Sequence, residues 1–177
     1  MYKLLIALIL LFSETALAGQ YENILYQKND TLEHALSFIG TPKDKIDQFK
    51  SIVHGELADK KLISFSNKII VARETHNVSL FKSLTDQESL RKSTNILNAL
   101  IGQINDGSLF YGNEDYKYFV TSRPITDDHL KIFLKNNNKP SAIIYFYFYY
   151  PLKERLIGSQ MFLIETKGGF KNVLPIK

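Results

Sequence analysis

The most regular hydrophobic pattern in the chain is the run AIIYFYFYY, residues 142–150. Because side chains alternate between opposite faces of a strand, a strand here would sort its rings, with phenylalanines on one face and tyrosines on the other. The Phe face would carry Ala142, Ile144, Phe146 and Phe148, and the Tyr face Ile143, Tyr145, Tyr147 and Tyr149. We expect a central strand with a dry Phe face. The Tyr face is either packed under the first half of the chain or exposed to a partner.

The segments around this run predict the rest of a C-terminal antiparallel meander. Strands are expected over 116–122, 156–166 and 170–174, with a tight turn at 167–169 and a bulge at Gly158. A capping box at 85–88 predicts a helix over 85–105 that covers the Phe face. A second, short helix is expected over 126–135, with Leu130, Phe133 and Leu134 facing inward.

The first half of the chain shows capped helices between short extended segments. A strand over 24–27 is followed by a helix with Asp30 as N-cap and Gly40 as its end. A second helix has Pro42 in its first position and ends at Gly55. The buried faces are expected to carry Leu32, Ala35, Leu36 and Ile39, and Ile46, Phe49, Ile52 and Val53. Extended segments over 61–65 and 68–72 then complete a strand-helix-helix-strand unit.

The fold class predicted from these patterns is α+β: a small strand-helix-helix-strand half, then a helix packed on a C-terminal antiparallel β-meander. Residues 1–18 are typical of a signal peptide, with Lys3, an apolar run over 4–12 and a small-x-small site ending at Ala18. That run is shorter than the roughly 20 residues of a membrane span. We therefore expect cleavage after Ala18, a periplasmic or secreted protein without a transmembrane segment, and two units over 19–75 and 76–177.

Composition narrows the functional classes further. The 177 residues include no cysteine, so an exported domain must rely on its core rather than on disulfides. The net charge of +4 is mild, and no block of like charge stands out, which argues against nucleic acid as a partner. Export, small size and absence of cysteine together favour a bacterial envelope protein.

The stretch from Tyr26 through Asn29-Asp30-Thr31-Leu32, with two short helices and a closing extended segment, resembles a LysM-like domain. The resemblance covers residues 23–72 and is greatest with the divergent LysM-like modules at the N-termini of some cell-wall endopeptidases. Asn29 stands where the family prefers glycine, and the turn before the last strand lacks the family's Pro-Gly-Gln. The resemblance implies a groove for N-acetylglucosamine-containing glycan, contacted by Asn29, Asp30, Thr31, His54 and Glu56.

No motif in the chain indicates catalysis or a cofactor. The four histidines, His34, His54, His76 and His129, have no metal-binding spacing, and neither H-E-x-x-H nor G-x-S-x-G occurs. We expect no metal, no cofactor and no enzymatic activity. A carboxylate pair assembled from distant segments would make a glycan-cleaving enzyme instead.

Two binding functions follow from these observations. The first is an exported, non-catalytic protein of the bacterial cell envelope that recognises peptidoglycan glycan through the five residues given by the LysM-like resemblance. The second is an interaction protein that meets an envelope protein of a pilus or secretion apparatus, or acts as a secreted virulence factor. In that case Tyr145, Tyr147 and Tyr149 would form the contact surface.

Overall fold

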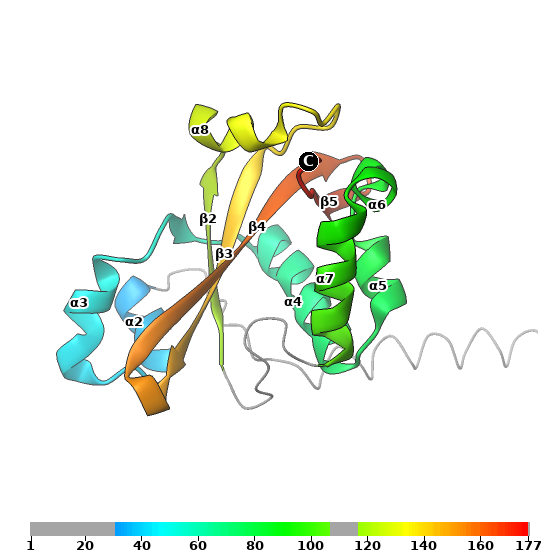
Figure 1. Cartoon of the computed structure of the whole chain (residues 1–177). Helices are drawn as coiled ribbons and strands as arrows, with labels where there is room; N and C mark the ends of the chain where they lie inside the picture. The colour runs from blue at the N-terminus through cyan, green and yellow to red at the C-terminus, as the bar shows by residue number, and fades with distance from the viewer. Residues whose placement is uncertain (1–30, 107–116, 177) are drawn as a thin grey trace, which may run out of the picture.

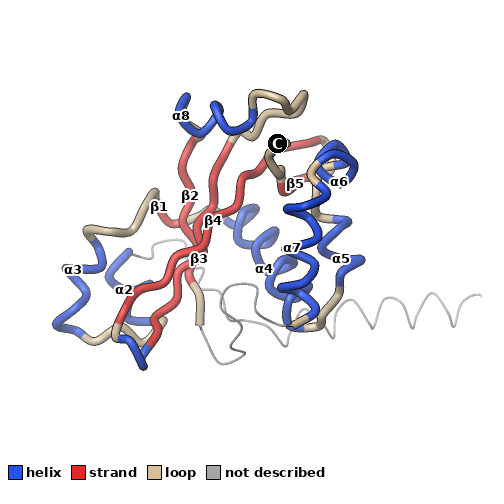
Figure 2. The backbone as a smooth tube through the Cα atoms, viewed as in Figure 1, coloured by secondary structure: helices blue, strands red, loops and turns tan. Residues whose placement is uncertain are grey.

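The computed structural model describes residues 31–106 and 117–176. In this part of the chain a five-stranded antiparallel sheet runs through the centre, with its strands in sequence order, as Figures 1 and 2 show. The strands are β1 (Glu56–Leu57), β2 (Phe119–Pro124), β3 (Ala142–Tyr150), β4 (Arg155–Thr166) and β5 (Gly169–Asn172). The α+β class and the C-terminal meander are confirmed. The predicted strand over 24–27 lies outside the described residues.

Helices cover both faces of the sheet, so the molecule has three layers (Figure 1). On one side lie α2 (Leu32–Phe38) and α3 (Ile46–Lys50). On the other lie α4 (Lys60–Glu74), α5 (Val78–Ser83), α6 (Gln87–Lys92) and α7 (Thr94–Asn105). The short α8 (Asp127–Leu130) sits at one end of the sheet, and single 3-10 turns occupy Lys43–Lys45, Lys131–Phe133 and Pro151–Lys153.

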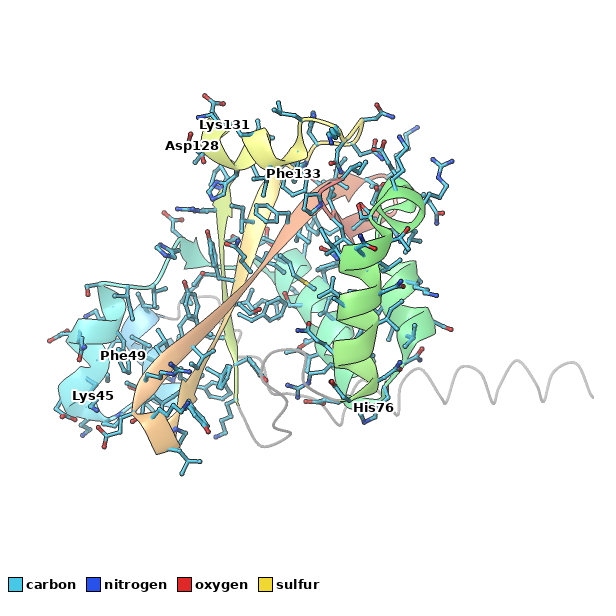
Figure 3. The ribbon with its side chains drawn as sticks, viewed as in Figure 1. Lys45, Phe49, His76, Asp128, Lys131 and Phe133 are labelled. Atoms are coloured by element: carbon cyan, nitrogen blue, oxygen red, sulfur yellow. The ribbon has the colours of Figure 1, made fainter. Side chains whose placement is uncertain are left out.

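Strand β3 is the middle of the sheet and has the predicted bounds. Its Phe face packs into the larger core with α4 and α7, where Ile144, Phe146 and Phe148 are buried. Its Tyr face packs into a second core under α2 and α3, where Phe49 reaches the ring of Tyr149 at 6.1 Å between ring centres. Figure 3 shows Phe49 on the sheet side of α3. The Tyr face is therefore packed under the first half of the chain and is not exposed to a partner, which was the other interpretation.

The helices of the Tyr side form largely where the caps predict them. Helix α2 begins after Thr31, whose side chain accepts a hydrogen bond from the His34 amide, so the N-cap is Thr31 and not Asp30 as predicted. Gly40 ends the helix with φ of +83°, a left-handed conformation that glycine adopts without strain. Ile52 was expected on the buried face of the second helix, but its side chain is 51% exposed because α3 ends at Lys50.

The extended segments predicted over 61–65 and 68–72 are wrong, because both belong to α4. Asp59 caps this helix by accepting a hydrogen bond from the Leu62 amide. The buried residues repeat at helical rather than strand spacing: Leu62, Ile63, Phe65, Ser66, Ile69, Ile70, Ala72 and Arg73. Two short apolar runs therefore form one helical face that packs on the Phe side of the sheet.

The predicted helix over 85–105 is two helices, with a break at Ser93. Asp86 is the N-cap of α6, and its side chain accepts from the Ser89 amide at 3.0 Å. Ser93 leaves helical geometry with ψ of 40° and donates its hydroxyl to the Leu174 carbonyl at 3.2 Å. The C-terminal segment thus binds at the break, and α7 covers the Phe face as predicted, together with α4.

Two smaller expectations, on the 126–135 segment and at Gly158, are also corrected. Of the three residues expected inward on the 126–135 helix, Phe133 is fully buried, whereas Leu134 is 76% exposed. Figure 3 shows Phe133 directed from this segment toward the strands. Gly158 forms no bulge, because it pairs with Tyr147 in an unbroken register. A Cβ atom there would lie 2.8 Å from the Tyr147 ring, so glycine leaves space for that ring.

Candidate functional site

His54, Arg123 and Tyr145 come together on the Tyr side of the sheet, at the end near α8. The Arg123 guanidinium lies over the Tyr145 ring, 5.5 Å from its centre, and the His54 ring lies 5.4 Å from the same ring. These contacts join the loop after α3 to β2 and β3. We call these three residues the planar cluster, because each presents a flat conjugated group.

The backbone around His54 fixes that residue to the sheet while leaving its side chain exposed. The His54 amide donates to the Tyr147 hydroxyl at 2.9 Å, and the Thr121 hydroxyl donates to the His54 carbonyl at 2.5 Å. Gly55 permits this approach, because its φ is +79° and a Cβ atom would meet the Ser122 carbonyl oxygen at 2.4 Å. Since both backbone groups of His54 are bonded, the imidazole is presented on a rigid support.

The Arg123 guanidinium contacts His129 through one nitrogen and has a second N–H donor, at Nε, without a partner among the described residues. Its Nη2 lies 3.2 Å from His129 Nε2, and His129 Nδ1 lies 2.6 Å from Thr126 Oγ1. Because arginine only donates, His129 Nε2 accepts, and the ring proton is on Nδ1, which donates to Thr126. The Nε of Arg123 is buried and has no hydrogen-bond partner among the described residues. A buried cationic donor without a partner is a position that a ligand acceptor would satisfy.

The tyrosines behind the planar cluster form a stack. The Tyr147 ring lies between Phe119 and Tyr145, with ring centres 5.2 Å and 6.1 Å apart, respectively. Burial raises the pKa of the Tyr147 phenol above its usual value, so the hydroxyl stays neutral and accepts from His54. Tyr147 therefore supports the cluster from within the sheet.

The structure brings together residues that the sequence assigned to two different sites. His54, expected in a glycan groove, contacts Tyr145 and Tyr147, which were expected in a partner surface. Tyr145, Tyr147 and Tyr149 are all buried, with exposures of 5%, 4% and 7%, so they do not form an open platform.

The other residues implied by the LysM-like resemblance lie apart from the planar cluster or outside the described chain. Glu56 is exposed on β1 and pairs with Ser122. Thr31 caps α2. Asn29 and Asp30 lie outside the described residues.

Arg123 and His129 were missed by sequence reasoning. Arg123 falls on the Tyr face only through the register that pairs it with Ile143, and no sequence pattern indicates that pairing. The signal that was present is the alternation of Thr121 and Arg123 in β2, which places both on one face. His129 was considered only as one of four histidines without metal-binding spacing.

The chemistry that this site supports is noncovalent recognition by flat groups and hydrogen-bond donors. In the described part of the chain, no group of three or more histidine or carboxylate side chains could hold a metal ion. Over the same residues, no helix has the length and apolar character needed to cross a membrane.

Comparison of the chain with family models, with curated proteins and with solved structures gives no significant match.

Proposed function

We propose that this chain is an exported, non-catalytic binding protein of the bacterial cell envelope, and that its planar cluster recognises peptidoglycan glycan. The observation that carries the proposal is the buried Arg123 Nε without a partner, beside the Tyr145 ring and the exposed imidazole of His54. The exposed His54 ring offers a flat face to a sugar ring, and the buried Tyr145 ring supports it from within the sheet. The acetamido and hydroxyl oxygens of a glycan accept hydrogen bonds from guanidinium and imidazole donors. Export is supported by the composition of residues 1–18.

A cosedimentation experiment with insoluble peptidoglycan tests this function. The purified protein should sediment with the cell wall, and Arg123→Gln should weaken binding about tenfold, because the charged donor is lost. Arg91→Gln is the matched control, because Arg91 is exposed on α6, on the opposite layer, and carries the same charge. His54→Ala should weaken binding less, since its exposed ring is one of several contacts.

The outcome that contradicts the proposal is equal binding by the Arg123 and Arg91 variants, or retention of folded wild-type protein in the supernatant. Retention together with capture of an envelope protein would instead support the protein-interaction function. Release of soluble muropeptides from the pellet would contradict the non-catalytic part of the proposal.

A further inference from the structure

A second surface feature lies on the opposite side of the sheet from the planar cluster. Helices α4 and α5 and the hairpin between β4 and β5 enclose a groove of about 1260 Å³. Figure 2 shows these helices on the face of the sheet away from α2 and α3. Pockets for small molecules in proteins commonly measure about 300–1,000 Å³, so this groove is large enough for an elongated ligand. We call it the lysine groove.

The interior of the lysine groove is apolar. Phe65 of α4 and Phe170 of β5 meet edge to face, with ring centres 6.3 Å apart. Val71, Leu80 and Leu84 continue this surface along α4 and α5. Phe170, Val71 and Leu80 are only half-buried, so the protein itself leaves this lining partly uncovered.

The charged residues around the apolar interior are almost all of one sign. Five lysines line the groove with a single acidic residue, Glu165, a net charge of +4: Lys60, Lys61, Lys68, Lys167 and Lys171. Lys171 donates to the Ser83 carbonyl and so ties the hairpin to α5. Among the described residues none of the five forms an ion pair with a carboxylate, so an anion in the groove would relieve their mutual repulsion.

The groove also has an unused polar atom in its wall. The side-chain oxygen of Asn67, on the groove side of α4, is buried and has no hydrogen-bond partner in the described part of the chain. Buried amide oxygens are normally bonded, and this one can only accept, so a water that accompanies an anionic head group could donate to it.

From this combination we infer that the lysine groove binds an anionic single-chain lipid. The lysines hold the carboxylate or phosphate head, and the alkyl chain lies along Phe65, Val71 and Phe170. A free inorganic anion would leave the apolar lining unused, and an uncharged chain would leave the lysines unpaired. Nucleic acid would require a continuous basic surface rather than an apolar trough between separate lysines. This inference does not rest on the proposed glycan function, because the two sites share no residue.

Calorimetric titration with sodium decanoate, below its micelle concentration and at low salt, tests the inference. The full protein should bind decanoate, and the double variant Lys61→Gln/Lys68→Gln should bind at least about tenfold more weakly, because two charge-assisted contacts are lost. The matched control is Lys135→Gln/Lys153→Gln, which removes the same charge at two exposed positions outside the groove and should bind as the wild type does. Val71→Glu should abolish binding by placing a carboxylate against the chain.

Four further measurements make the result decisive. Inorganic phosphate and the uncharged tetraethylene glycol monodecyl ether should each bind at least about tenfold more weakly than decanoate, because each offers half of the required chemistry. Equal loss of binding in the two double variants, or equal affinity for decanoate and either comparator, would overturn the inference. Melting curves of all variants identify a loss that comes from unfolding, and cosedimentation with peptidoglycan should be unchanged in the Lys61/Lys68 variant.

Discussion

The two faces of β3 are both buried, but one is covered by apolar contacts alone and the other also by a hydrogen bond to a phenol. On the Phe face, rings without polar atoms pack against the longer helices α4 and α7, and burial alone stabilises the contact. On the Tyr face, short helices and a loop cover the strand, and the phenol of Tyr147 accepts a hydrogen bond from His54. The Phe face requires only complementary shape. The Tyr face requires a specific polar partner, and its planar cluster lies where that requirement is met.

The largest loss of stability is expected from the Phe face. Phe146 is fully buried, so Phe146→Ala should lower the free energy of unfolding by about 3–5 kcal/mol through lost burial and a residual cavity. Denaturant titration followed by circular dichroism measures this change. Leu134→Ala is the control, because Leu134 is apolar but 76% exposed, and it should change stability by less than about 0.5 kcal/mol. A similar loss in both variants would contradict the assignment of the core.

Crowding on the Tyr face should produce the next largest effect. Gly158→Ala places a Cβ atom 2.8 Å from the Tyr147 ring, which neighbouring rings hold in place, and should cost about 1–3 kcal/mol. In a Tyr147→Ala background the same substitution should become neutral. Gly102→Ala in α7 has no atom within 4 Å of the new Cβ and should stabilise by about 0.5–1 kcal/mol. Equal effects at the two glycines in thermal denaturation would show that the Tyr147 ring is free to move.

Removal of a single hydroxyl group tests the polar requirement of the Tyr face directly. Tyr147→Phe leaves the His54 amide without its acceptor and should cost about 1 kcal/mol. Tyr149→Phe removes a hydroxyl for which the described residues provide no hydrogen bond, and it should be close to neutral. Chemical denaturation of both variants gives the comparison. If Tyr149→Phe proved the more damaging, the assigned role of the His54 contact would be wrong.

The smallest effect on stability at neutral pH is expected from the ionised carboxylate of Glu88, on the Phe side of the sheet. Glu88 at the start of α6 accepts from the amides of Asn137 and Asn138 and pairs with Lys92. The Asn138 amide and the Lys92 contact hold its pKa below the usual 4.5. A lowered pKa in the folded protein means that the contribution to stability is complete above about pH 4.5. It is lost as pH falls through the lowered value.

Melting temperatures between pH 7 and pH 3 measure this dependence. The melting temperature of the wild type should fall as the pH is lowered below about 4.5. Glu88→Gln should have a lower melting temperature at pH 7, and its melting temperature should fall less between pH 7 and pH 3. Glu154, paired with Lys45 but largely exposed, also has a lowered pKa, so Glu154→Gln serves as the comparison with a weaker effect. If the melting temperature of Glu88→Gln fell with pH as steeply as that of the wild type, Glu88 would not be the cause of the acid sensitivity.

Much of this fold could be predicted where the sequence pattern has a single interpretation. The alternation in 142–150 allows only one assignment of faces, and the bounds of β3 match the prediction. The segment 60–74 was predicted wrongly because two five-residue apolar runs fit a pair of strands as well as a helix. Only the position of Asp59 as N-cap and the continuous spacing across Ser66 distinguish the two.

The candidate site was predictable only in part, because it depends on pairing between strands. The sequence singled out His54, Tyr145 and Tyr147, but it placed them in separate sites. Their meeting depends on Gly55, which lets the loop approach β2, and on the register that sets Thr121 opposite Tyr145. Faces within one strand follow from alternation, whereas the neighbour across a sheet is set by turn lengths and long-range packing.

The position of β3 in the chain has a consequence for how the molecule is made. A polypeptide is synthesised from its N-terminus. Both helical layers, residues 32–50 and 60–105, therefore emerge before β3. The segment most prone to self-association thus arrives after the helices that cover both of its faces, and only β4 and β5 follow it. A circular permutant that placed residues 142–150 first would reverse this order and should accumulate as insoluble aggregates.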